Sequence, residues 1–342
     1  MKILIIGSLS NYAIERYFNK YLNNRTHLDV ECKVFVAQDL FLDYYNKSLA
    51  NKIIFRLGHE AIYKSINIKL KNFIEDYQPD IIWVFKGMEV FPETLKWAKE
   101  KHIKLINFNP DNPFIFTGSG SGNSNVSRSI GLYDIHFTYN HNTKKELEKK
   151  YKIPTFWLPF GYDISEVQYQ DALRENEILK TCFIGTPDFT RVEFLKEIAK
   201  SGIKVDLFGN HWKNHVNHKN FTIHPAVYGN ELLAHLHKYR IQLNPLRIHN
   251  VDSHGMRSFE VPGIGGLMLA PRTTEHVKFF EEGKESFFYS TTHEAISRIN
   301  EILALTSEET TMLRKNARQR CITSGYSYEN RTEEVLTILN TV

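Results

Sequence analysis

The first half of the chain alternates short apolar runs with stretches whose apolar residues recur at helical spacing. The apolar runs cover residues 2–7, 30–37, 80–87, 104–109, 135–140 and 154–159. Helices are expected at about 12–22, 92–101 and 143–151. Strands that are apolar on both faces and are separated by helices predict a parallel sheet with helices on both sides. This half is therefore expected to be a doubly wound α/β domain.

After a polar stretch at residues 161–179 the same pattern starts again. Apolar runs follow at 179–185, 204–209, 241–246, 267–270 and 286–289, with helices expected at about 190–200, 231–239 and 274–282 and again toward the end. We expect domains at 1–163 and 175–324, joined by a linker near 158–178. Two such Rossmann-like domains would face a central cleft, and open sheets bind ligands beyond the carboxyl ends of their strands.

Composition and charge narrow the class of protein. The 342 residues carry 43 basic and 39 acidic side chains, a net charge of +4, which indicates no nucleic-acid partner. Cys32, Cys182 and Cys321 form no C-x-x-C pair and are typical of reduced thiols. No apolar run is long enough to span a membrane. We expect a cytoplasmic protein; a peripheral contact at the inner face of the membrane and the oligomeric state stay open.

The segment DSHGMRSFEVPGIGG, residues 252–266, is the strongest candidate for a binding site. Pro262 is tolerated only in or beside the first turn of a helix, so the helix should begin no earlier than about Ser258, with Ser258 as N-cap and Glu260 in the first turn. Free N–H groups at such a start suit a phosphate, and Arg257 could add a bidentate contact. A carboxylate slightly further on suits a ribose diol. The alternative is a capped helix start before a buried strand.

Asp252 and Glu260 form a D-x7-E pair, which resembles the E-x7-E motif of retaining glycosyltransferases with the GT-B fold. The longer run MRSFEVPGIGGLMLA is similar to the CgeB-like glycosyltransferases related to spore maturation. Further pieces resemble that family in the same order: PDIIWVFKG, NPDNP, LPFGYD, FIGTPDFTR, LFGNHW, VYGNELLAHLHKYRIQLNPLR and YSYENR. The resemblance implies a GT-B fold whose last helix, at about 325–342, crosses back to the first domain.

The resemblance also implies roles for single residues in the binding of a nucleotide-sugar donor. Gly185 would leave room for the donor phosphates, and Arg191 would be their cation, although Arg191 could also be an ordinary helix-surface arginine. Tyr228 and Gly229 would lie by the base, or would form only a turn before a helix. Glu260 would bind the ribose. Asp252 would face the donor sugar, although Asp is one methylene shorter than the usual Glu. Apart from the resemblance, His254 lies inside the same motif, and Asp252 and His254 are the candidate catalytic residues on the sugar side.

On the acceptor side, Asp111 within NPDNP follows a strand and is a candidate base. An Asx turn before Pro113 is the alternative. Lys86 with Gly87, and Gly7 with Ser8, also follow strands and are weaker candidates. The Gly- and Ser-rich stretch 117–125 is expected to be either a mobile loop at the active site or a plain surface loop.

No metal or cofactor is expected from the sequence. It has no D-x-D motif, so cations and a helix start would have to stabilise a departing diphosphate. The histidines at 211, 215, 218, 235 and 237 lack the Cys or carboxylate neighbours of a metal site and are expected at the surface. GxSxG, P-loop and HExxH motifs are absent too, which disfavours serine hydrolases, P-loop NTPases and common zinc proteases.

These observations predict a metal-independent glycosyltransferase that transfers a sugar from a nucleotide-sugar donor, with UDP favoured, to a glycan, a lipid-linked molecule or a protein. Retention of configuration is favoured by the D-x7-E spacing. Two alternatives stay open: a nucleotide-sugar 2-epimerase of the same fold, and a non-catalytic module that binds a nucleotide sugar or a glycan.

Overall fold

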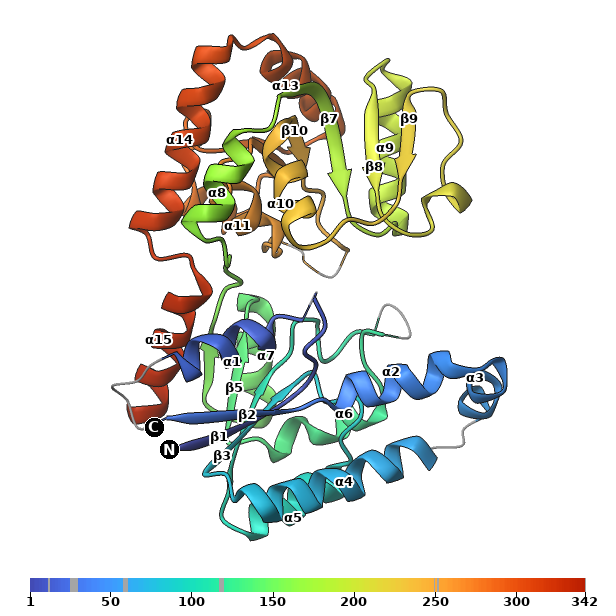
Figure 1. The fold of residues 1–342 in the computed structure, drawn as a ribbon, viewed down its shortest axis with the longest axis vertical. Coiled ribbons are helices and arrows are strands. Elements are labelled where there is room, and N and C mark those ends of the chain that lie inside the picture. Colours follow the sequence, from blue (N-terminus) through green and yellow to red (C-terminus); the bar gives the residue numbers. More distant parts are fainter. Residues whose placement is uncertain are drawn as a thin grey trace. The chain divides into compact units, whose positions relative to one another are not determined.

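The structure, a computed structural model, describes residues 1–11, 13–24, 30–57, 61–116, 120–248, 250 and 252–341. The chain divides into two compact units. Unit 1 comprises Met1–Pro159 together with Val335–Val342, and unit 2 comprises Phe160–Glu334. The last helix, α15 (Tyr328–Thr341), therefore begins in unit 2 and ends in unit 1 (Figure 1).

Unit 1 contains a parallel six-stranded sheet in the order β2-β1-β3-β4-β5-β6. Its strands are β1 (Lys2–Ile6), β2 (Glu31–Phe35), β3 (Ile81–Phe85), β4 (Lys104–Phe108), β5 (Ile135–Thr138) and β6 (Thr155–Trp157). Its helical segments are α1 (Glu15–Asn23), α2 (Ala37–Lys47), α3 (Leu49–Arg56), α4 (Ala61–Tyr77), α5 (Pro92–Glu100), α6 (Ser124–Ser129), the 3-10 turn η1 (Ile130–Leu132) and α7 (His141–Tyr151).

Both faces of the sheet are buried at β1, β3 and β4, which explains why these strands are apolar without alternation, whereas the edge strand β2 alternates exposed and buried residues. On one face Leu4, Ile82 and Leu105 belong to a cluster that also contains residues of α4 and α5. On the other face Trp83 packs against Phe18 of α1, with ring centroids 4.8 Å apart. The doubly wound arrangement predicted for this half of the chain is confirmed.

Unit 2 repeats the design with a parallel six-stranded sheet in the order β12-β11-β10-β7-β8-β9. Its strands are β7 (Ile178–Ile184), β8 (Val205–Phe208), β9 (Phe221–His224), β10 (Tyr239–Leu243), β11 (Met268–Pro271) and β12 (Phe287–Tyr289). Its helical segments are α8 (Glu166–Leu173), α9 (Phe189–Lys200), the 3-10 turn η2 (Trp212–Asn214), α10 (Gly229–Lys238), α11 (Arg257–Gly263), α12 (His276–Phe279), α13 (Thr292–Ala304), α14 (Ser307–Thr323) and the start of α15.

The strand orders place a switch point in each sheet, where consecutive connections leave in opposite directions. In unit 1 this point lies between β1 and β3, and in unit 2 it lies between β7 and β10. Ligands of open parallel sheets bind beyond the carboxyl ends of the strands at such points. The topology therefore selects the loops after these four strands as the places to look for a site.

The hydrophobic pattern missed several elements, among them α2, α3, α4 and α6 in unit 1. The expected linker contains α8, which starts with a capping box between Ser165 and Gln168. The S-x-x-Q spacing of this box was a readable signal. Strand β9 lies between residues 209 and 231, where no element was predicted, and has only four residues, too few for a periodicity to show. Residues 117–119 of the Gly- and Ser-rich stretch lie outside the described residues.

Within the part of the chain that the structure describes, no helix has the length and apolar character needed to cross a bilayer. The three cysteines are all buried, and none is bonded to another.

Candidate functional site

The loops after β7 and β8 touch through their backbones. The N–H of Gly185 donates to the carbonyl of Phe208 at 2.9 Å, and the carbonyl of Gly185 accepts from the indole Nε1 of Trp212 at 2.8 Å. A side chain at Gly209 would collide with the same carbonyl, because a Cβ there would lie 2.2 Å from it. At Gly185 a Cβ would meet the ring of Phe183 at 2.8 Å. Packing against backbone therefore requires glycine at 209, whereas a side chain at 185 would have to displace the Phe183 ring.

Arg191 lies across the switch point of unit 2. It sits in the first turn of α9, whose N-cap Asp188 accepts from the Arg191 N–H at 3.0 Å. Its guanidinium donates from Nε to the carbonyl of Pro245 after β10, at 3.0 Å, and from Nη1 to the carbonyl of Thr186 after β7, at 3.3 Å. Only 14% of the side chain is exposed. Arg191 is therefore not the helix-surface arginine of the alternative interpretation.

Two further guanidinium groups act on Arg191. Burial lowers the pKa of Arg191 to about 10, and the positive charges of Arg247 and Arg257 contribute to that shift while Asp188 opposes it. Arg247 is exposed, and its Nη2 lies 3.4 Å from the Thr186 hydroxyl. The Nε of Arg257 is buried and has no hydrogen-bond partner among the described residues. The three positive charges near one strand end repel one another, and a bound anion would relieve that repulsion.

Helix α11 carries Arg257 and Glu260, which form an ion pair. A buried polar network fixes the helix on its buried side. The Ser258 hydroxyl accepts from Asn244 of the loop after β10 at 3.1 Å and lies 2.8 Å from Nε2 of His276 on α12. Because these partners come from two other elements, the direction of α11, and with it the position of the Arg257 and Glu260 side chains, is set by packing beneath the helix.

The start of α11 differs from the prediction in three respects. The helix begins at Arg257, its N-cap is Met256 and not Ser258, and Pro262 lies inside it. The expected free N–H groups are not free at Ser258, Phe259 and Glu260, because all three donate to carbonyls of Gly255 and Met256. The Ser258 side chain is turned into the interior instead of capping. The cations, and not the helix start, are thus the stronger candidate for anion binding.

Asp252 is exposed but both of its carboxylate oxygens are engaged. One accepts from the Thr274 N–H at 2.7 Å and the other from the Thr274 hydroxyl at 2.6 Å. Burial acts to raise the pKa of Asp252, but the hydrogen bonds from Thr274 outweigh it and leave the pKa below its usual value. Asp252 therefore ties its loop to the segment before α12, and its carboxylate oxygens would have to leave Thr274 before they could contact a donor sugar.

His254 does not reach a surface from which it could touch a sugar. The residue is fully buried, with its ring surrounded by Phe160, Phe259 and Phe279. Nδ1 lies 2.5 Å from the Glu275 carboxylate, and Nε2 accepts from the Phe160 N–H at 3.2 Å. The predicted catalytic role of His254 does not fit this position, because its ring anchors the 252–256 loop.

Tyr228 and Gly229 form the start of α10, as the turn interpretation also allowed. Tyr228 is the N-cap residue and is half exposed, and Gly229 has a φ of +56°. A Cβ at Gly229 would meet nothing within 4 Å, so the backbone conformation, and not crowding, favours glycine there. The exposed Tyr228 ring is free of intramolecular stacking in the described residues and can offer a face to a planar ligand.

At the switch point of unit 1, Lys86 joins the loops after β3 and β4. Its Nζ lies 2.6 Å from Oδ2 of Asp111 and donates to the carbonyl of Gly120 at 2.7 Å. Lys86 itself has a left-handed φ of +59°. The Asx-type hydrogen bonds in NPDNP are made by Asn109 and Asn112, which accept from the N–H groups of Asp111 and Phe114. Asp111 would have to leave Lys86 before it could accept a proton.

The end of β1 holds a second group of polar side chains. The Ser8 hydroxyl donates to Asp39 at 2.5 Å, and the Ser8 N–H donates to the buried carboxyl of Glu15 at 2.8 Å. Burial raises the pKa of Glu15 to about 7, more than its hydrogen bonds and Lys86 lower it. Burial likewise raises the pKa of Glu89, after β3, to about 7. This edge therefore carries two carboxyl groups that change charge near neutral pH.

We expect Glu15→Gln to become more stable than the wild type as pH rises. The folded-state pKa of Glu15 is above its unfolded value, so its contribution is favourable below pH 4.5 and is lost between about pH 4.5 and 7. Gln keeps the oxygen that accepts from Ser8 but never ionises. The difference in unfolding free energy should grow by about 3 kcal/mol across that range, measured by urea unfolding. A pH-independent difference would show that Glu15 does not titrate there.

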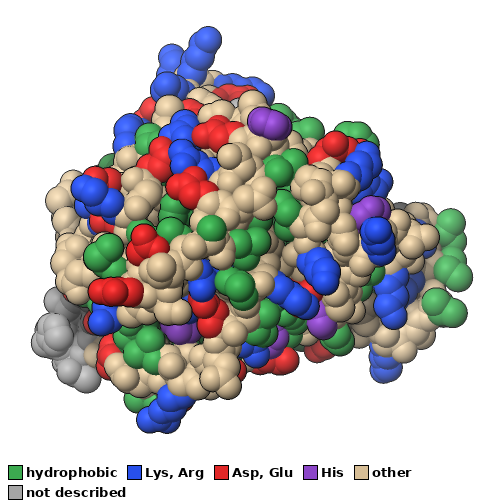
Figure 2. All heavy atoms as spheres, turned by 90° about the horizontal axis from the view of Figure 1, so that it is seen from above, with side chains coloured by type: hydrophobic (Ala, Val, Ile, Leu, Met, Phe, Trp, Pro, Cys, Tyr) green, Lys and Arg blue, Asp and Glu red, His purple; other side chains and the backbone are tan. Residues whose placement is uncertain are grey.

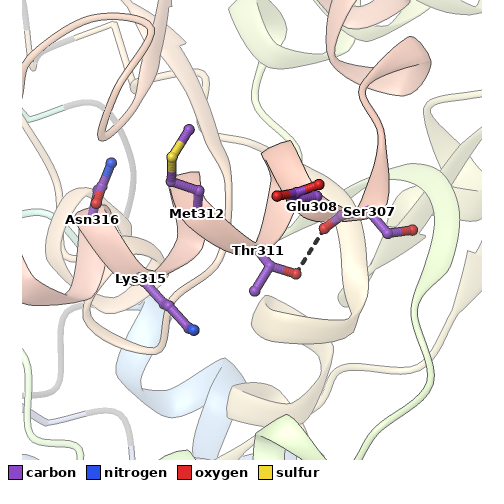
Figure 3. A pocket seen from close by; sticks show the side chains of 6 residues that line it. All are labelled: Ser307, Glu308, Thr311, Met312, Lys315 and Asn316. Atoms are coloured by element: carbon purple, nitrogen blue, oxygen red, sulfur yellow. Dashed lines mark hydrogen bonds between the residues drawn. The ribbon is translucent and has the colours of Figure 1, made fainter.

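Two surface hollows of unit 2 lie away from the strand ends. One is lined by six residues of α14 alone (Figure 3), among which the Thr311 hydroxyl donates to the Ser307 carbonyl at 2.7 Å. The other lies between α8 and α10, where Gln168 donates to Asn230 at 2.8 Å. Neither contains a predicted site residue, and neither gathers the converging charges seen at the switch point.

The histidines form no metal site in the described residues, where no group of three His, Cys, Asp or Glu side chains is placed to hold an ion. His237 is buried, which corrects its expected place at the surface, and burial lowers its pKa to about 4. His211 has a left-handed φ of +71° at the start of η2.

Arg247 and Thr186 are the candidate binding residues that the sequence interpretation did not single out. Both lie in segments that carry the family resemblance, FIGTPDFTR and IQLNPLR, each directly after a buried apolar run. Their place in the chain, just after an apolar run, is the signal that could have found them. The first residues beyond two neighbouring parallel strands meet at one edge of the sheet. Without the strand order, nothing shows that β7 and β10 are neighbours.

Residues 191–337 match the sequence profile of a family described as glycosyl transferase-like. No curated protein matches the chain in sequence. The match covers α9 through most of α15 and includes most of the cationic site, but not Gly185 or Thr186. The likeness to the narrower CgeB-like group stays a prediction.

Solved structures share the fold at low identity. Sucrose-phosphate synthase from Thermosynechococcus elongatus has a TM-score of 0.69 and 11% identity, covering 100% of this chain and 98% of that one. Anabaena HepE, in complex with UDP and glucose, has a TM-score of 0.65 and 11% identity over 100% of both chains. UDP-GlcNAc 2-epimerase from Neisseria meningitidis, bound to UDP-GlcNAc, has a TM-score of 0.56 and 15% identity over 100% of both. The predicted GT-B fold of two Rossmann-like domains is confirmed.

Proposed function

We propose that this protein is a glycosyltransferase that binds a nucleotide sugar, with UDP as the favoured nucleotide, at the carboxyl ends of β7 and β10 in unit 2. The observation that carries the proposal is that Arg191 bonds to the carbonyls of Thr186 after β7 and Pro245 after β10, and that Arg247 reaches the Thr186 hydroxyl. The charge of Arg257 also acts on Arg191. The glycosyl transferase-like match to residues 191–337 and the shared fold support it.

The diphosphate is assigned to the three guanidinium groups. A diphosphate carries several negative charges and oxygens in pairs, which match the planar fork of arginine. Arg257 has an unpartnered Nε that can meet a ligand directly, and the exposed Arg247 can turn to one by giving up a single long hydrogen bond, 3.4 Å, to the Thr186 hydroxyl. Arg191 is already aligned by the Pro245 and Thr186 carbonyls and would supply a fixed charge.

The nucleoside is assigned to the neighbouring polar groups of unit 2. Glu260 has 10% of its side chain exposed and would accept from the ribose hydroxyls, with Arg257 holding the carboxylate in place. The half-exposed ring of Tyr228 would lie against the base, next to the left-handed turn at Gly229. In this proposal Gly185 shapes the loop behind the phosphates, and Asp252 orders the loop on the sugar side through Thr274.

In the transfer step an acceptor hydroxyl oxygen forms a bond to the anomeric carbon as the bond from that carbon to the diphosphate breaks. The electron pair of the broken bond leaves on the diphosphate, where the three cations stabilise it without a metal. The acceptor proton passes to an oxygen of the departing diphosphate. Retention stays the favoured outcome from the D-x7-E spacing alone. The acceptor is a glycan, a lipid-linked molecule or a protein.

The experiment that tests this function compares uridine, UMP, UDP and UDP-sugars by thermal shift and calorimetry. Ligand binding raises the melting temperature according to its affinity and concentration. We expect the shift to increase with each phosphate, because the cations face the diphosphate. Equal shifts for uridine and UDP, or none for any nucleotide, would overturn the donor site.

Glu260→Ala should separate the ribose contact from the phosphate contact. Loss of hydrogen bonds to a charged acceptor is expected to weaken UDP binding about tenfold. Binding of inorganic pyrophosphate should be unchanged or tighter, because a negative charge beside Arg257 is removed. Titration calorimetry with both ligands measures the split. Equal weakening of UDP and pyrophosphate would mean that Glu260 only maintains the shape of α11.

A nucleotide-sugar 2-epimerase is the second candidate, favoured by the fold shared with UDP-GlcNAc 2-epimerase. Incubation with UDP-GlcNAc and no acceptor distinguishes the two reactions, since only an epimerase yields an epimerised sugar. A protein that binds UDP-sugars but turns none over with any acceptor would be a binding module.

A further inference from the structure

Helix α3 of unit 1 leaves most of its apolar side chains in solvent. It contains no buried residue, and Leu49 is 77%, Ile53 56% and Leu57, just after the helix, 73% exposed. Single exposed apolar residues are normal on protein surfaces, but a group of them within nine positions is not. These three residues are spaced by four and therefore lie on one face of the helix.

The opposite side of α3 attaches it firmly to the rest of unit 1. Phe55 packs against Phe41, Tyr45 and Tyr63, with ring centroids 4.9, 5.9 and 5.4 Å apart. The Asn51 amide donates to the carbonyl of Tyr44 at 2.7 Å. A helix of eight residues is too short to be stable alone, so this packing forms it and leaves the outer face unused within the chain.

The charged side chains within α3 and its immediate flanks have one sign. Residues 46–57 contain Lys47, Lys52 and Arg56 and no Asp or Glu. Lys52 and Arg56 follow Leu49 by three and seven positions, so they border the apolar face. Figure 1 shows α3 at the outer end of unit 1, and Figure 2 shows hydrophobic side chains next to Lys and Arg side chains at that edge.

We propose that the face of α3 formed by Leu49, Ile53 and Leu57, with Lys52 and Arg56 beside it, binds the surface of a membrane that contains anionic lipid. The apolar side chains enter the boundary between head groups and acyl chains, and the cations remain at the level of the phosphates. An apolar protein partner would not require the cations, and an acidic one would not require three large exposed aliphatic side chains. The inference goes beyond the transfer reaction and does not depend on it.

Flotation of the purified full chain with vesicles tests the proposal. Vesicles of phosphatidylcholine alone are compared with vesicles of equal parts phosphatidylcholine and phosphatidylglycerol. We expect clear binding to the anionic vesicles and weak binding to the neutral ones. Leu49→Glu with Leu57→Glu should lower the partition coefficient at least about tenfold. Lys52→Gln with Arg56→Gln should lower binding to anionic vesicles about tenfold or more and leave neutral vesicles unchanged.

Met312→Glu on α14 is the matched control, because Met312 is 58% exposed and lies on unit 2. It should bind vesicles as the wild type does, and urea unfolding should show that all variants remain folded. Absence of wild-type binding, or equal binding by the leucine variant, would overturn the proposal. A wild-type dimer in light scattering that the leucine variant converts to a monomer, without vesicle binding, would assign the face to a second copy of the chain.

Discussion

Arg191→Met is expected to weaken UDP binding about 100-fold. The side chain is a fixed cation at the switch point of unit 2, and a hydrogen bond to a charged group contributes about 1.5–3 kcal/mol. Methionine keeps the length and the packing of the stem but has no charge and no donor. Uridine has no phosphate, so its affinity should change little. Titration calorimetry of UDP and uridine therefore measures the contribution of the charge.

Two further variants separate the charge of Arg191 from its structural role. Arg174→Met removes a cation that is 79% exposed on the side chain, at the end of α8, and should bind UDP as the wild type does. Arg191→Lys keeps the charge but not the fork and should lie between the wild type and Arg191→Met. If UDP and uridine weakened together in Arg191→Met, Arg191 would only support the fold through Pro245 and Thr186.

Gly209→Ala is expected to cost about 3 kcal/mol of unfolding free energy or more. Gly209 has a φ of +150°, and a Cβ there would lie 2.2 Å from the Gly185 carbonyl oxygen. The backbone must then move, which threatens the hydrogen bond from Trp212 to that carbonyl. Overpacking of this kind destabilises by roughly 1–3 kcal/mol, and the unfavourable φ adds about 1 kcal/mol. Urea unfolding measures the loss, and UDP affinity should fall with it.

Gly202→Ala is the matched substitution. Gly202 follows α9 with a φ of +97°, but a Cβ there would have no neighbour within 4 Å. Only the backbone conformation opposes alanine, so a loss of about 1 kcal/mol and no change in UDP affinity are expected. Similar losses of unfolding free energy in the two variants would show that the backbone at Gly209 and Gly185 can move apart at little cost.

The strands were readable in the sequence because both faces of each sheet are buried. A run such as ILII or IIWVF contains no polar residue and is therefore recognised as a buried strand. The helices between the strands are recognised by apolar residues at helical spacing. The hydrophobic pattern did not reveal elements that are largely exposed, because their residues need not be apolar. Helix α8 is mostly exposed, and β9 at the edge of its sheet is short and only partly buried.

The candidate site was readable in part. The residue types of DSHGMRSFEVPGIGG indicated anion and ribose binding, and Arg257 and Glu260 do lie together on α11. The directions of the other side chains were not readable, because Ser258, Asp252 and His254 are turned by partners on distant segments. Those partners are His276, Thr274 and Glu275, all more than fifteen positions away.

By itself, the sequence determined the class of fold, the repetition of that fold in two halves and the chemical character of the loops, because apolar periodicity and residue type are local properties. Only the tertiary structure decided which loops meet. The order of the parallel strands makes β7 and β10 neighbours, and this brings Arg191, Thr186 and Arg247 to one edge. Packing also turned His254 from a candidate for the sugar into a buried anchor, because a ring with two bonded nitrogens and three aromatic neighbours has no open side.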